Sequence, residues 1–84
     1  MKIVTYILEV LIMFAKELVH DGHVRRFSVS DAGQEGWEVR VEEDAAVVRR
    51  LCYTDWHRVE RALGSITLEV QALVSNGWQD RTAH

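Results

Sequence analysis

The chain has 84 residues, of which 48% are hydrophobic, with ten basic and thirteen acidic side chains. This length fits one domain, and the hydrophobic share is that of a globular protein rather than a disordered one. The net charge of −3 argues against a polybasic protein that binds nucleic acid or membranes through charge alone. A single cysteine, Cys52, cannot form an internal disulfide, and we therefore expect a cytoplasmic protein.

The first twenty residues contain the most apolar stretch of the sequence. The run from residue 3 to 15 is interrupted by Glu9 and is shorter than the roughly twenty apolar residues of a membrane span. It also lacks the small-residue cleavage pattern of a signal peptide. The pattern favours an amphipathic helix over residues 3–20 that ends at Asp21-Gly22. A membrane anchor at 3–15 and a strand at 2–8 are the alternatives.

A helix that is apolar on most of its circumference needs cover on most of it. Within this chain only a small sheet and one further helix are expected to supply that cover. A second copy of the chain is the economical solution, so we predict a homodimer, with another protein as the alternative partner. The predicted interface comprises the apolar side chains Ile7, Leu11, Phe14, Leu18 and Trp78.

Residues 24–53 show the period-two alternation of strands. We expect strands at about 24–30, 37–43 and 46–53, joined by short loops into an antiparallel meander. The facing of the third strand stays open. In a regular strand one face holds Val47, Arg49, Leu51 and Tyr53, and the other holds Val48, Arg50 and Cys52.

Apolar residues recur every three or four positions between Trp56 and Leu73, which predicts a helix at about 55–75. Thr54 or Asp55 is its expected N-cap, and Asn76-Gly77 its end. The resulting fold class is α+β: a helix, a three-stranded antiparallel meander and a second helix in a single domain over residues 1–84.

Few residue patterns in the chain point to chemistry. Metal-ligating residue types occur at His20, His23, Cys52 and His57, but no CxxC or HExxH spacing is present. Cys52 and His57 also lack the orienting group and oxyanion site that nucleophilic catalysis needs. We therefore expect no metal, no cofactor and no enzymatic activity.

The alternative function is single-stranded nucleic-acid binding by the exposed sheet face. Sheets that bind single strands combine basic side chains with aromatic side chains that stack on bases. The candidate phosphate contacts are Arg26, Arg40, Arg49 and Arg50, and the candidate stacking groups are Trp37 and Tyr53. Each arginine has an acidic neighbour, which favours a solvated ladder of opposite charges along Arg26, Ser28, Ser30, Glu38, Arg40 and Glu42.

Overall fold

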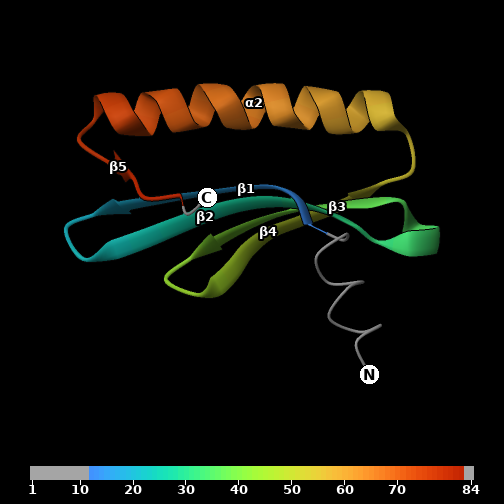
Figure 1. The fold of residues 1–84 in the computed structure, drawn as a ribbon, viewed down its shortest axis with the longest axis horizontal. Coiled ribbons are helices and arrows are strands. Elements are labelled where there is room, and N and C mark those ends of the chain that lie inside the picture. The colour runs from blue at the N-terminus through green and yellow to red at the C-terminus, as the bar shows by residue number, and fades with distance from the viewer. Residues whose placement is uncertain (1–11, 83–84) are drawn as a thin grey trace.

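The computed structural model describes residues 12–82, which form a five-stranded antiparallel sheet with one long helix on one face (Figure 1). The strands are β1 (Ile12–His20), β2 (His23–Asp31), β3 (Trp37–Glu43), β4 (Ala46–Tyr53) and β5 (Gln79–Asp80). Their order across the sheet is β4-β3-β2-β1-β5. The helix α2 (Trp56–Ser75) follows β4, and a short 3-10 turn, η1 (Gly33–Glu35), joins β2 to β3.

The expected order of helix, three-stranded meander and helix is wrong. Residues 12–20 of the predicted N-terminal helix form β1, and β5 pairs with the other side of β1. The earlier part of that predicted helix, including Ile7 and Leu11, lies outside the described residues. The strands expected at 24–30, 37–43 and 46–53 have their counterparts in β2, β3 and β4, and the helix expected at 55–75 has its counterpart in α2.

The Asp21-Gly22 pair forms the turn between β1 and β2. Asp21 has φ 49° and Gly22 has φ 78°, and His20 pairs directly with His23 across the turn. A two-residue turn with two positive φ angles matches the twist of an antiparallel hairpin, and Asp-Gly is a preferred sequence for it. The same glycine would serve as a helix end. The local signal therefore fits both structures, and pairing with β2 decides between them.

The turn between β3 and β4 contains no glycine. Asp44 and Ala45 have φ angles of 51° and 70°, a conformation that costs a non-glycine residue energy. Hydrogen bonds from β2 offset part of this cost. The Asp44 carboxylate accepts the backbone N–H of Val24 at 2.8 Å and lies 2.9 Å from His23 Nδ1.

The core lies between α2 and the central strands. Its buried side chains come from three strands and the helix: Leu18, Phe27, Val29, Val39, Val41, Val59, Ile66 and Val70. Asp55 caps the helix, since its carboxylate accepts the backbone N–H of His57 at 3.0 Å. Within residues 12–82, no helix combines the length and hydropathy that crossing a membrane requires.

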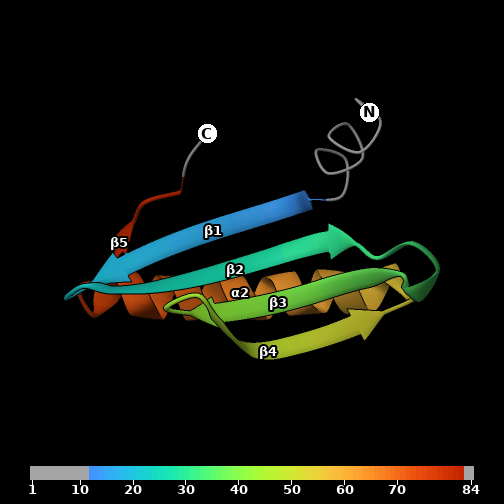
Figure 2. The same ribbon diagram turned by 90° about the horizontal axis from the view of Figure 1, so that it is seen from below.

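One helix is too narrow to cover this sheet. Four strands at about 4.8 Å spacing span roughly 15–19 Å, whereas a helix with its side chains is about 10–12 Å wide. From below, α2 is seen behind the central strands, with β4 at the sheet edge (Figure 2). The edge strand β4 is therefore covered incompletely on the helix side, where Leu51 is 48% exposed. The opposite face of the sheet has no covering layer among the described elements.

Candidate functional site

The uncovered face of the sheet, here called the open face, holds the polar row expected from the sequence. Cross-strand partners share a face, and Arg26 pairs with Glu42, Ser28 with Arg40, and Ser30 with Glu38. These six residues line a shallow hollow of about 340 Å³. Acidic and basic side chains alternate here, so the open face carries no extended positive field.

Glu38 is the centre of this charged row. Although it lies on the open face, only 7% of the residue is exposed, because Arg40 and Arg50 cover it. Arg40 contacts the Glu38 carboxylate at 2.7 Å, and Arg50 contacts its other oxygen. The nearby carboxylate raises the pKa of Arg50. From the sequence, Glu38 was expected only as one member of a ladder of opposite charges. Its burial was not predictable, because it depends on arginines from two different strands.

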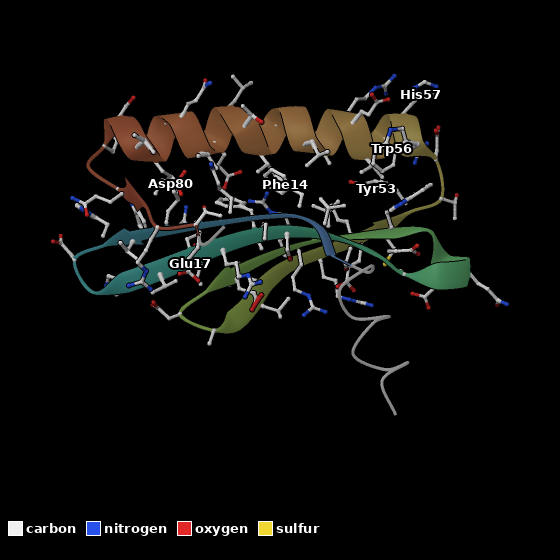
Figure 3. All side chains as sticks on the ribbon, viewed as in Figure 1. Phe14, Glu17, Tyr53, Trp56, His57 and Asp80 are labelled. Atoms are coloured by element: carbon white, nitrogen blue, oxygen red, sulfur yellow. The ribbon has the colours of Figure 1, made fainter. Side chains whose placement is uncertain are left out.

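The structure separates the predicted phosphate contacts from the predicted stacking groups. Trp37 pairs with Tyr53, and both lie on the helix side of the sheet. The Trp37 ring stands edge-on to Trp56 with 5.0 Å between centroids, and Tyr53 and Trp56 lie at the start of the helix (Figure 3). Arg49 faces the same side and contacts Glu69 at 3.4 Å. The stacking groups therefore do not accompany Arg26, Arg40 and Arg50 on the open face.

The predicted interface residues that the structure describes pack within a single chain. Leu18 is fully buried beneath α2, where it cannot contact a second chain. Trp78 is half-buried against the core, 5.4 Å from the His20 ring and 5.2 Å from the Arg25 guanidinium. Phe14 is half-buried between β1 and the helix (Figure 3).

An apolar groove of about 560 Å³ runs beside Phe14. Ile66, Val70 and Val74 of α2 form one wall. Lys16 of β1 and Asp80 of β5 form an ion pair of 2.7 Å at its base. This contact holds the pKa of the Asp80 carboxyl far below its ordinary value, and it fastens β5 to the edge of β1.

The residues considered for metal binding or nucleophilic chemistry have other neighbours. Among residues 12–82, no three metal-ligating side chains converge. Cys52 lies on the open face, and its Sγ is 4.0 Å from a carboxylate oxygen of Glu35. His57, in the first turn of α2, lies 3.4 Å from Glu60. Cys52 and His57 thus lie next to different carboxylates, Glu35 and Glu60.

Among the strand residues whose exposure the structure describes, the most exposed large apolar side chains lie on β4. Val47, Val48 and Leu51 are 50%, 53% and 48% exposed, and we call these three residues the β4 surface. Every residue of β4 except Tyr53 is exposed. β4 is an edge strand, and its outer side has no strand partner in the described part of the chain.

A β-bulge places the apolar side chains of β4 on both faces of the sheet. Val41 pairs with Arg49, but the next residue, Glu42, pairs with Val47, so β4 has one extra residue at Val48. Val47 therefore shares the open face with Glu42, whereas Leu51 shares the helix side with Val39. The regular alternation, which places Val47 on the same face as Leu51, is therefore wrong for Val47. The consecutive apolar residues 46–48 were the only sequence signal of the irregularity.

Comparisons of the chain with protein-family models, with curated proteins and with solved structures found no match.

Proposed function

We propose that this chain is a non-enzymatic protein-interaction module whose contact surface is the β4 surface. The observation that carries the proposal is the exposure of three aliphatic side chains along an edge strand of eight residues. Edge strands of monomeric proteins are commonly short, charged or covered, because their backbone donors and acceptors pair readily with another chain. An apolar edge suits strand addition, in which a partner pairs with the backbone and its side chains pack on both faces.

The two arginines of β4 do not protect this edge strand from pairing in the usual way. Charged side chains on an edge strand oppose pairing with another chain. Arg49 instead contacts Glu69 on α2, and Arg50 contacts Glu38 on β3. Both charges are thus drawn back toward their own chain. This supports an edge that accepts a partner.

The single cysteine supports a cytoplasmic location for this module. Cys52 is exposed, and a lone exposed thiol is better suited to a reducing compartment than to an oxidising one. The absence of an internal disulfide means that folding requires no oxidant.

Substitution of Leu51 tests the proposal. Leu51→Lys places a third positive charge on β4 and removes an apolar contact, and Leu68→Lys on the outer side of α2 is the matched control. We expect Leu51→Lys to weaken association by about tenfold or more and Leu68→Lys to leave it unchanged. Two measurements read out association: sedimentation velocity of the chain alone, and binding of extended peptides selected from a displayed random library. Equal behaviour of both variants and the unmodified chain in both measurements would overturn the proposal.

A further inference from the structure

We infer that the partner of the β4 surface is a second copy of this chain, joined by an antiparallel β4–β4 pair centred on Leu51. This inference rests on the proposed function and names its partner. It predicts a sheet that continues across the dimer, with one helix from each copy on the same side. The charges and the bulge of β4 both select this register.

Symmetry limits how two copies of one edge strand can pair. Two identical antiparallel strands in one continuous sheet are related by a two-fold axis perpendicular to it. One residue then faces its own copy, and the residues on either side of it pair reciprocally. The residue of β4 that faces its own copy therefore determines the register.

Arg49 and Arg50 cannot occupy the central position without cost. Either choice sets two guanidinium groups directly opposite each other, and like charges in that position destabilise a strand pair. The bulge excludes Val47 and Val48 as centres, because the extra residue bends the strand and disrupts a regular ladder.

Leu51 is the centre of the regular part of β4. The strand pairs with β3 without irregularity from Arg49 to Tyr53, and the bulge lies on one side of this stretch. On the other side, the chain leaves the sheet at Thr54 and enters α2. A pair centred on Leu51 uses all five regular residues, whereas a centre at Cys52 uses fewer of them.

The charges of the chain complement each other in this register. Arg50 lies opposite the partner's Cys52, and the Cys52 thiol is within 4.0 Å of Glu35 in its own chain. Each Arg50, which stays paired with Glu38 of its own chain, thereby comes near the partner's Glu35. On the helix side, Leu51 meets its own copy, and Arg49 lies opposite the partner's Tyr53. No two arginines face each other directly, and the two Arg50 residues lie diagonally across the pair.

The short pairing stretch predicts a weak dimer. Stable interfaces bury about 800 Å² on each partner, which five paired residues do not reach. We therefore expect a concentration-dependent equilibrium in the micromolar range. In sedimentation equilibrium, the average mass should rise from that of the 9.7 kDa chain toward twice this value.

Oxidative cross-linking tests the register directly. Residues that face each other in an antiparallel pair have Cα atoms about 4.5–5.5 Å apart, within the range that a disulfide bridges. In a Leu51→Cys, Cys52→Ser chain, two thiols from two copies should lose two electrons and two protons to an added oxidant such as oxidised glutathione. The unmodified chain is the control, because its two Cys52 residues lie diagonally at about 7–8 Å. We expect at least about tenfold faster cross-linking through position 51, since the diagonal pair exceeds the usual disulfide distance.

The outcomes separate the register from the proposed function. Fast cross-linking at position 51, abolished by dilution, supports the inference. A dimer that is sensitive to Leu51→Lys but cross-links faster through Cys52 overturns the Leu51 register and leaves the proposed function standing. A chain that stays monomeric while β4 binds peptides overturns the second copy as partner.

As an independent readout on the unmodified chain, amide hydrogen exchange should show protection of those amides of residues 49–53 that point away from β3, and this protection should be lost on dilution. Unchanged protection of these amides would also overturn the inference.

Discussion

Gly36 holds the start of β3 against the end of β4, and replacing it with alanine should destabilise the whole sheet. Gly36 has φ 90° and ψ −115°, a backbone conformation that side chains rarely adopt. A Cβ at this position would lie 2.1 Å from the carbonyl oxygen of Tyr53 and 2.8 Å from the Cα of Thr54. Both atoms belong to backbone, so no flexible side chain can move aside.

The magnitude follows from two separate costs. A non-glycine residue in a sparsely populated backbone region costs about 1–3 kcal/mol. Forcing an extra carbon into a closely packed position costs about another 1–3 kcal/mol. The total of about 2–6 kcal/mol is a large part of the roughly 4–13 kcal/mol expected for a domain of 84 residues. We expect Gly36→Ala to be strongly destabilised and partly unfolded at 37 °C.

Gly33→Ala is the matched control. Gly33 also has a positive φ, 65°, but a Cβ there would meet nothing within 4 Å. Its cost should be limited to the backbone preference, about 1–2 kcal/mol. Urea unfolding followed by far-ultraviolet circular dichroism measures both variants. If Gly36→Ala loses no more stability than Gly33→Ala, the close approach of Gly36 to Tyr53 is not present in solution.

Two further variants probe the turn and the core. Contact with Asp44 raises the pKa of His23 above 6.5, and the hydrogen bond from the Val24 backbone, followed by the contact with His23, lowers the pKa of Asp44. The His23 contribution to stability is therefore complete below pH 6.5 and is lost as the pH rises through the raised pKa, while the Asp44 contribution is lost only in acid. Asp44→Asn should return the His23 pKa, measured by NMR titration, toward 6.5, and an unchanged value would contradict the pairing. Leu18→Ala should cost about 2–5 kcal/mol in urea unfolding, and a loss no larger than that of Val19→Ala on the opposite face would remove β1 from the core.

The centre of the sheet and the helix were predictable because their signals are local. Phe27 and Val29 alternate with polar residues, as do Val39 and Val41, and all four are buried. In α2, the recurrence of apolar residues at intervals of three and four matches the buried seam at Val59, Ile66 and Val70. In these elements, each side chain's environment follows from the repeat of its own segment.

β1 was not predictable because its environment depends on distant residues. Lys16 lies on the helix side of β1, although its charge suits the polar face of the amphipathic helix expected over residues 3–20. Its charge is accommodated by Asp80, which comes after the whole of α2 and pairs next to it at the sheet edge. Hydrogen bonds extend this contact, since the backbone N–H of Glu17 donates to the Thr82 hydroxyl at 3.0 Å. The residues next to Lys16 in the sequence therefore cannot show that Asp80 is its partner.

The same limit applies to β4, and there it bears on function. A strict alternation assigns Val47 and Leu51 to one face, and an apolar face is normally covered by the chain's own core. The bulge shifts Val47 to the open face while Leu51 stays on the helix side, so no single layer of this chain can cover both. A strand added alongside β4 contacts both faces at once. Under the proposed function, a partner strand would pair along the regular stretch centred on Leu51, because the bulge at Val48 disrupts a regular ladder beyond Arg49.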